Sequence, residues 1–400
     1  MKSNDSPVYL SKWECPVCGG KNEHKTLRMG AYIEEGRDTD FCPKKRTWKN
    51  PNYQKFNPLL FFMATCAGCH FTKEFTTKFK DWKSDSAFRN YKQKPLQEKH
   101  QNEVKRKKNI IKLLGENLDG EKYPFQTAVN KILLGIYDEK FNMKFSNLDL
   151  GRYFLRIGWL FREISDGSSQ NTSQLASHAM RIEDLIYRMG SQYEQIRAGA
   201  EDLKKATDNF MNDSSFPDGD NRASLMEQYQ KGFEEMKAAL EKQKGAVVTF
   251  KGSLGLSTDV MNSHTDSASP MDQPFMSFDS YRNFLREAKS MWVEVPLSEQ
   301  EALKSASDYY KAAYETGGEI SHGNQSIQAV YLIAELSRRI GSHDEAKGYF
   351  NTAIKLAQEY IHQNKGDKSR TALARKIFEM AMEQGKLNLQ EAKQTANEPA

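Results

Sequence analysis

The chain of 400 residues is 38% hydrophobic and 28% charged with a net charge of +5, a composition that excludes a largely disordered or fibrous protein. Its longest apolar stretch, in NPLLFFMATCAGC, is too short for a membrane helix of roughly 18–20 residues, and the N-terminus lacks the apolar core of a secretory signal. Five cysteines, an odd number, argue against the disulfide framework of a secreted protein, so we expect a cytoplasmic protein of two or three domains.

Residues 1–95 differ from the rest of the chain, because they hold all five cysteines and three of the five tryptophans. TLRMGAYI alternates apolar residues with the period of a strand, and HFTKEFTTKF has a similar pattern, so we predict a small β-rich module. Residues 1–112 also hold 24 Lys and Arg against 12 Asp and Glu, a balance of +12, whereas the remainder is mildly acidic. This basic character indicates either a solvated lysine-rich surface or a nucleic-acid site.

Two CxxC pairs, Cys15 with Cys18 and Cys66 with Cys69, carry the strongest chemical signal in the sequence. Each pair can present two sulfurs from one tight turn, and four thiolates in a tetrahedron are a ligand set that zinc prefers. Iron or another metal is an alternative, and so is redox chemistry, although neither pair lies at a strand-to-helix junction. We therefore predict a structural zinc ion held by these four cysteines, with His70 on the surface or beside the ligands.

The segment RDTDFCPKKR, residues 37–46, lies between the two pairs and contains the fifth cysteine. A fifth thiolate would overfill a tetrahedral site, so we interpret Cys42 as a small buried side chain, with ligand exchange or a reactive thiol as alternatives. Asp38 and Asp40 could perform acid–base chemistry, but no histidine is near them in the sequence, which favours a solvated or capping role. We expect this segment to be a strand or turn between the cysteine pairs.

From residue 96 onward the apolar residues recur at helical spacing. PLQEKHQNEVKRKKNIIKLL predicts a basic helix. PFQTAVNKILLGIYDEKF has Pro124 in its first turn, and SNLDLGRYFLRIGWLFREIS begins with Ser146 as a cap, so we predict an antiparallel helix pair within residues 96–170.

Residues 171–245 predict a long helical hairpin in which apolar residues recur every seven positions, as in a coiled coil. The residues of this seam are Ile182, Met189, Ile196, Leu203 and Phe210. The seam either packs within the hairpin or joins two chains, so a homo-oligomer is an alternative. Residues 246–280 are rich in Ser, Gly, Asp and Pro, which predicts a flexible linker.

Residues 281–385 are helical again and contain the pattern of a tetratricopeptide repeat, with small residues where two helices cross, a glycine between them and an aromatic residue on the second helix. The residues that fit this pattern are Ile333, Ala334, Gly341, Ala346, Phe350 and Ala353, with Ala306, Tyr310 and Ala313 as an upstream repeat. A simple helical hairpin without a groove is the alternative. We expect residues 386–400 to be a frayed tail.

Taken together, these segments resemble an uncharacterised bacterial family catalogued as domain of unknown function 2225. The family pattern contains a CPxC element, R-D-x-D-F-C-P, an N-P-L-aromatic step and a CxxCG-aromatic pair. The matching residues are Cys15, Pro16 and Cys18; Arg37, Asp38, Asp40, Phe41, Cys42 and Pro43; Asn57, Pro58 and Leu59; Cys66, Cys69 and Phe71. LRIGWLFRE and YLIAELSRRIG resemble its helices, whereas CAGCH departs from the usual glycine. The resemblance implies zinc binding and a tetratricopeptide-like scaffold, without an established activity.

We therefore expect a mainly α fold with a small zinc-ribbon-like module, and a non-enzymatic scaffold that binds protein partners through its helical repeats. A nucleic-acid-binding protein is the alternative, supported by the KRKK run at 105–108 and by aromatic residues among the lysines. These aromatic residues are Trp13, Trp48, Tyr53, Phe56 and Trp82. An enzyme that uses Asp38, Asp40 and Cys42 is the least favoured hypothesis.

Overall fold

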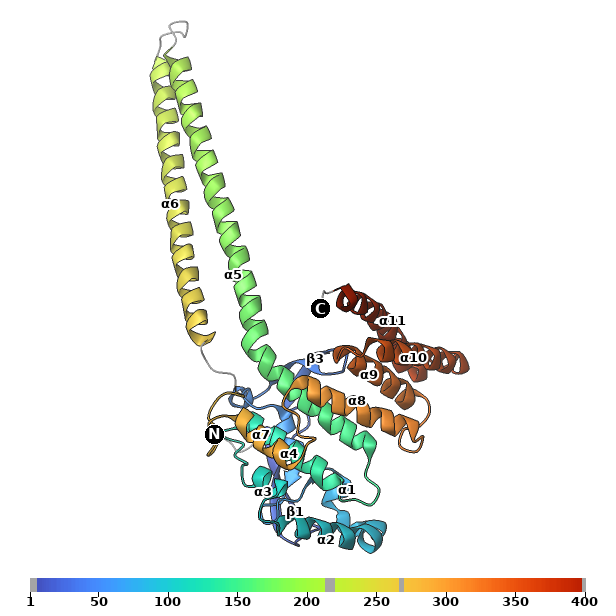
Figure 1. The fold of residues 1–400 in the computed structure, drawn as a ribbon. Helices are drawn as coiled ribbons and strands as arrows, with labels where there is room; N and C mark the ends of the chain where they lie inside the picture. The colour runs from blue at the N-terminus through green and yellow to red at the C-terminus, as the bar shows by residue number, and fades with distance from the viewer. Residues whose placement is uncertain (1–5, 213–219, 266–269, 398–400) are drawn as a thin grey trace. The chain divides into compact units, whose positions relative to one another are not determined.

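The computed structural model describes residues 6–212, 220–265 and 270–397. The chain divides into two compact units, of which the first contains residues 1–164 and 270–400 and the second contains residues 165–269. Figure 1 shows that helices dominate the chain and that the strands are confined to the N-terminal part. The predicted mainly α fold with a small β-rich N-terminal module is thereby confirmed.

The strands of the first unit form three separate antiparallel hairpins. β1 (Val8–Glu14) pairs with β2 (Lys21–Leu27), β3 (Tyr32–Arg37) with β4 (Pro43–Trp48), and β5 (Met63–Thr65) with β6 (Thr72–Glu74). TLRMGAYI does not form the single strand that its alternation predicted. Gly30 lies between β2 and β3 with a φ of 68°, a left-handed conformation that glycine adopts readily and that makes the chain turn.

Short helices connect these hairpins to the helical part of the first unit. They are η1 (Pro51–Tyr53), η2 (Pro58–Phe61), α1 (Thr77–Lys80), η3 (Trp82–Ser84), η4 (Phe88–Lys92), α2 (Gln93–Val104) and α3 (Ile110–Gly115). Pro124 opens α4 (Pro124–Glu139), and Ser146 Oγ accepts a hydrogen bond from Asp149 N at the start of α5 (Asn147–Met211). The rings of Phe125 and Phe161 join α4 to α5 at a centroid distance of 6.3 Å.

The C-terminal helices are α7 (Tyr281–Met291), α8 (Glu299–Glu315), α9 (Asn324–Arg339), α10 (His343–Gln363) and α11 (Lys368–Asn397). Ala334, Ala346 and Phe350 are buried where α9 and α10 meet, and Gly341 turns the chain between them with a φ of 79°. This is the helical hairpin that the repeat pattern predicted, although its identity as a tetratricopeptide repeat stays a prediction. α11 continues past residue 386, where we had predicted a frayed tail, because Asn388 is buried and donates a hydrogen bond to His343 O.

One hydrophobic core links segments of the first unit that the sequence suggested were separate. It contains Trp48 from β4, buried residues of α3 and α4, the first part of α5, and residues of α7, α8 and α9. Ala306 and Tyr310, which we had assigned to an upstream repeat, belong to this core. Segments 1–95 and 281–385 and most of segment 96–170, up to residue 164, therefore share a compact unit, while the boundaries proposed between them stay predictions.

The second unit consists of the remainder of α5 and of α6 (Asp220–Thr265), which run antiparallel. Tyr193 donates a hydrogen bond to Glu241, and Thr207 donates one to Tyr229. α6 continues through 246–265, so the linker predicted from residue 246 is wrong for this stretch. The glycines of residues 246–265 each weaken the helix by only about 1 kcal/mol, and these residues include no proline that would end it.

The side chains described in the predicted seam of the second unit are only partly buried. Met189 is exposed, and Ile196 and Leu203 are each 56% exposed, whereas Ile182 and Phe210 lie outside the described side chains. The coiled-coil interpretation and a homo-oligomer built on it stay predictions. Among the helices that the structure describes, none combines the length and apolar character needed to cross a lipid bilayer.

Candidate metal centre

Two equivalent loops carry the four predicted ligands. Residues 15–20 connect β1 to β2, and residues 66–71 connect β5 to β6. In the first loop Cys15 N donates to Gly20 O at 2.9 Å, and in the second Cys66 N donates to Phe71 O at the same distance. The two hairpins thus fold their CxxC pairs into the same turn and present them to each other.

The four sulfur atoms converge on one point. The Sγ atoms of Cys15, Cys18, Cys66 and Cys69 all lie within 4.8 Å of one another. Cys15 Sγ is 3.7 Å from Cys69 Sγ, and Cys18 Sγ is 3.5 Å from Cys66 Sγ. Sulfurs around a tetrahedral zinc ion, at bonds of about 2.3 Å, would lie about 3.8 Å apart. The arrangement is therefore compatible with a four-coordinate metal site.

Hydrogen bonding among the sulfurs changes their affinity for protons. The pKa of the Cys66 thiol is lowered, mainly because the Cys15 and Cys69 thiols donate to it. The pKa values of Cys15 and Cys69 are raised, because hydrogen bonding to the neighbouring sulfurs favours their protonated forms. A metal cation would replace these shared protons and hold all four groups as thiolates.

His70 takes the place of the glycine expected after the second pair. Gly19 follows the first pair with a φ of 71°, and His70 adopts the same left-handed backbone with a φ of 62°. The imidazole packs against Gly115 at the end of α3, where an added Cβ would lie 2.3 Å from the ring. His70 therefore lies beside the ligands, as we had expected, and Gly115 provides the space that its ring needs.

Further residues that the sequence did not indicate support the two loops. Asn22 of β2 accepts a hydrogen bond from Ala67 N at 2.9 Å and donates a longer one to Cys66 Sγ at 3.5 Å, so it ties one hairpin to the other loop. His100 of α2 lies 2.9 Å from Cys69 O and 2.8 Å from the buried carboxylate of Asp138. Burial alone would lower the pKa of His100, but hydrogen bonding to Asp138 outweighs it and raises the pKa. Such contacts fix the orientation of metal-binding loops.

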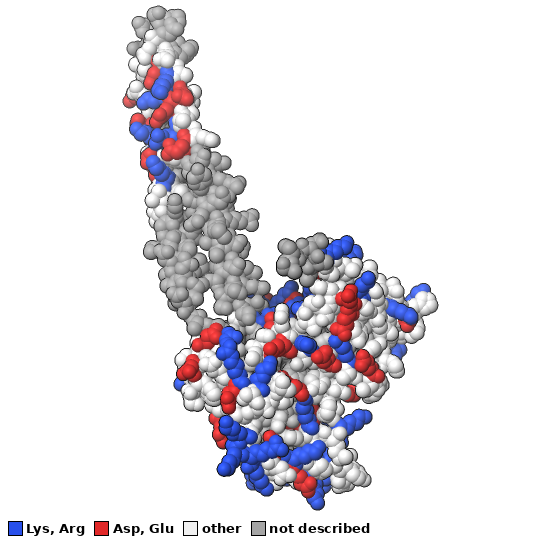
Figure 2. Space-filling model, in the orientation of Figure 1, with Lys and Arg blue, Asp and Glu red and all other residues white. Residues whose placement is uncertain are grey.

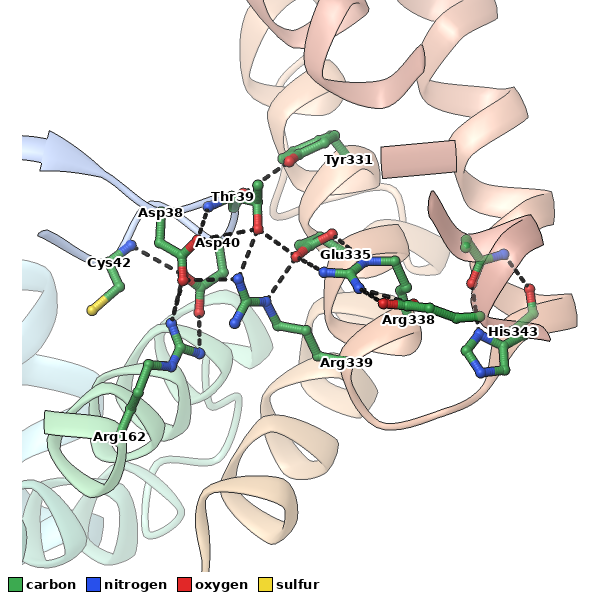
Figure 3. Close-up of polar contacts among 12 residues, drawn as sticks. Asp38, Thr39, Asp40, Cys42, Arg162, Tyr331, Glu335, Arg338, Arg339 and His343 are labelled. Carbon is green, nitrogen blue, oxygen red and sulfur yellow. Dashed lines mark hydrogen bonds and ion pairs between the residues drawn. The ribbon is translucent and has the colours of Figure 1, made fainter. Parts of the chain in front are cut away.

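Cys42 and the two acids of RDTDFC lie away from the sulfur cluster, in the turn between β3 and β4. The segment is therefore a turn between the cysteine pairs, as predicted. Asp40 is fully buried, and its carboxylate receives hydrogen bonds from Arg162 at 2.7 and 3.1 Å and from Trp159 Nε1 at 3.1 Å. Figure 3 shows Arg162 reaching from α5 to both Asp38 and Asp40. The predicted solvated or capping role is wrong for Asp40, because a buried carboxylate needs charged partners.

The ion pairs of Asp38 and Asp40 with Arg162 form one half of a buried polar network, and helix α9 contributes the other half. Arg339 donates to Asp38 at 2.9 Å and to Thr39 Oγ1 at 2.7 Å, and it also pairs with the buried carboxylate of Glu335 at 2.7 Å. Burial raises the pKa of Asp38, but Arg339 and hydrogen bonding overcome that effect and leave the pKa below its ordinary value. Tyr331 completes the contact by donating to Thr39 O at 2.9 Å.

The thiol of Cys42 is separate from this polar network. Its backbone N donates to Asp40 at 3.2 Å, while the sulfur points away in Figure 3 and lies near Pro43 O. Burial, together with the negative charge of Asp40, raises the pKa of Cys42 to about 12. The side chain is thus the small buried group that we had predicted, and it lies outside the described four-sulfur cluster.

A family model described as "uncharacterized protein conserved in bacteria (DUF2225)" matches residues 8–211 and 286–388. A search of curated proteins and a search of solved structures both return no match.

Proposed function

The chain belongs to this uncharacterised bacterial family, and on that premise we propose that it is a zinc-binding, non-enzymatic scaffold that recruits protein partners through helices α8–α11. One observation carries the proposal. The sulfur cluster and the acids of RDTDFC are satisfied inside the first unit, whereas the outer side of α11 carries exposed apolar side chains. We expect zinc because four thiolates form its usual closed structural site, in which no position is open for a substrate.

We propose no catalytic role for Asp38, Asp40 and Cys42. A general base must be free to accept a proton, but arginine side chains donate to both carboxylates. A nucleophilic cysteine needs a thiolate, and a pKa of about 12 keeps Cys42 protonated at neutral pH. The geometry therefore favours a structural use of these residues.

We propose that the partner contacts the outer side of α11. A groove of about 540 Å³ runs along this side, and Phe378, Met382 and Leu387 contribute its apolar part. Met382 is 41% exposed and Leu387 is 37% exposed, while two acids, Glu379 and Glu383, and one base, Lys386, border the same groove. An amphipathic helix whose apolar stripe is flanked by Lys or Arg fits this pattern of charge and apolar surface.

Metal analysis of the purified full-length chain tests the zinc part of the proposal. Wild-type protein and Cys42→Ser should contain zinc in equal, stoichiometric amounts, whereas Cys66→Ser should lose most of it. The Cys42→Ser variant is the matched control, because it also removes one thiol from the β-rich part. Iron in the wild type, or equal zinc in all three proteins, would contradict the assignment.

Site-specific crosslinking tests the partner surface. A photo-crosslinking residue in place of Met382 should capture a discrete protein in the native bacterium, and Leu387→Glu should abolish that product. The same residue in place of Gln358, an exposed position on α10, is the matched control. Identical products from positions 382 and 358, or products that persist in Leu387→Glu, would refute a specific surface on α11.

Nucleic-acid binding is the second candidate function. Figure 2 shows Lys and Arg side chains gathered over the part of the first unit that Figure 1 labels β1 and α2. However, Trp13, Trp48 and Phe56 are buried, so they are not available to stack on bases as we had considered. Backbone-driven binding would fall steeply between about 50 and 200 mM salt. Absence of association with a labelled RNA or DNA at 50 mM salt would exclude this alternative.

A further inference from the structure

A cleft of about 460 Å³ in the first unit lies outside both the sulfur cluster and the groove on α11. Its walls come from β2, the β3–β4 hairpin, the segment around η2, the end of β6 and the first part of α5. We call it the arginine cleft, after Arg37 and Arg156, which line it together with Tyr32, Phe62 and Trp159. Three stretches of the sequence that resemble the family pattern, RDTDFCP, NPL and LRIGWLFRE, meet at this cleft.

Arg156 is a half-buried cation of the cleft. Its guanidinium donates one hydrogen bond to Arg152 O at 3.0 Å and lies 4.5 Å from the centre of the Phe62 ring. Neither Arg156 nor Arg37 forms an ion pair with any acid in the described parts of the chain. Burial, and to a smaller degree the charge of Arg152, lower the pKa of Arg156. The attraction of Glu74 opposes this effect without overcoming it, although Glu74 lies beyond ion-pair distance of Arg156. Desolvating a guanidinium without an acid in ion-pair contact is costly, and a bound anion would offset that cost.

The acids that line the cleft already have partners. Glu34 pairs with Arg46 at 3.7 Å, and Glu74 pairs with Arg152 at 3.3 Å and accepts a hydrogen bond from Tyr153. The charges that remain are therefore those of two guanidinium groups. A guanidinium presents a planar fork of donors that matches a carboxylate or a phosphate.

Aromatic rings form much of the remaining wall. Trp159 is held in place by its hydrogen bond to Asp40, and the Tyr32 ring packs against Trp48 at a centroid distance of 5.2 Å. Phe61 and Phe75 also line the cleft. Rings fixed beside a cationic group are suited to stack on a planar ligand, and the volume lies within the range of small-molecule sites.

We propose that the arginine cleft binds a small organic anion in which a carboxylate or phosphate is joined to a planar ring. Arg156 and Arg37 bind the anionic group, and the aromatic wall contacts the ring. Trp159 links the cleft to the buried network, because its indole contacts both the cleft and the carboxylate of Asp40.

Isothermal titration of the full-length, metal-loaded chain tests this proposal with three probes: adenosine monophosphate, benzoate and inorganic phosphate. The first two share the proposed chemistry, with a phosphate joined to a ring system in one and a carboxylate joined to a ring in the other. Inorganic phosphate lacks the ring and should bind at least about tenfold more weakly than adenosine monophosphate, since stacking contributes on this scale. Equal binding of the two would overturn the role of the aromatic wall.

Variants identify the groups responsible. Arg156→Met and Arg37→Met should each weaken binding by about tenfold to a hundredfold, the usual effect of losing a charge-assisted hydrogen bond. Arg37 is exposed, so its substitution tests the site even if Arg156→Met does not fold. Arg28→Met is the matched control, because Arg28 is an arginine near the β-hairpins that does not line the cleft. Absence of binding by both ring-bearing probes at millimolar concentration, or equal affinity in wild type and Arg37→Met, would overturn the proposal.

Discussion

Removing the Arg162 guanidinium provides the strongest test of the buried network. Its side chain is 11% exposed and donates to Asp38, Asp40 and Glu299 at distances of 2.7 to 3.1 Å. Arg162→Met keeps most of the side-chain volume but leaves the fully buried carboxylate of Asp40 without its main cation. Breaking a buried ion pair by removing one partner costs about 3–5 kcal/mol, and we expect a loss of that size in the free energy of unfolding.

Urea unfolding followed by tryptophan fluorescence measures this loss in the relevant part of the chain, because all five tryptophans lie in the first unit. Adding Asp40→Asn to Arg162→Met should recover about 1–3 kcal/mol, since the uncompensated charge is removed. Lys25→Met is the control. It breaks an ion pair with Glu121 in which both side chains are more than half exposed, so it should cost less than about 1 kcal/mol.

The pH dependence gives a second readout of the same network. Against the effect of burial, Arg339 and to a smaller degree Arg162 hold the pKa of Asp38 in the folded protein below its ordinary value of about 3.9. The contribution of Asp38 to stability is therefore present above that value and disappears as the pH falls through the folded pKa. The difference between wild type and Arg162→Met should therefore narrow below about pH 4. Equal losses in Arg162→Met and Lys25→Met, or no recovery in the double variant, would refute the reasoning.

Three further predictions concern the loops, the fifth thiol and the second unit. Gly115→Ala should lower the free energy of unfolding by about 1–3 kcal/mol and reduce zinc retention, because the new methyl group would collide with the His70 ring. Gly68→Ala is the control, because its methyl group meets open space and should change neither quantity. Equal effects of the two substitutions would contradict this packing. Iodoacetamide at pH 8 should modify free cysteine at least about a thousandfold faster than Cys42, because a pKa of about 12 leaves little Cys42 thiolate. Rapid modification of Cys42, detected by peptide mass spectrometry, would disprove this prediction. Light scattering should detect self-association that Leu203→Glu weakens, because Leu203 belongs to a half-exposed apolar seam, and a monomeric wild type would rule this out.

Features formed by residues that are close together in the sequence could be predicted from it. Two CxxC pairs are each encoded within four positions. Helix α4 begins at Pro124, and the start of α5 is capped by Ser146. The network could not be predicted in this way. Asp40 meets Arg162 after 122 residues, and Asp38 meets Arg339 after 301 residues, so the residues that neighbour the acids in the sequence could not indicate either arginine. His100 was missed beside Cys69 for the same reason, because a single histidine on a predicted helix gives no spacing signal.

The network explains why a segment rich in acids, bases and a thiol can be structural. An apolar turn could also pack between α5 and α9, but apolar contacts are not directional and would fix neither the position nor the direction of the hairpin. Asp38 and Asp40 instead bind one arginine from each helix, so the observed position of β3–β4 between α5 and α9 satisfies both carboxylates. Buried ion pairs add little net stability, yet a misplaced hairpin would leave charges unpaired at a cost of several kcal/mol. We infer that these residues serve the specificity of the fold, because a hairpin placed elsewhere would leave both carboxylates without their arginine partners.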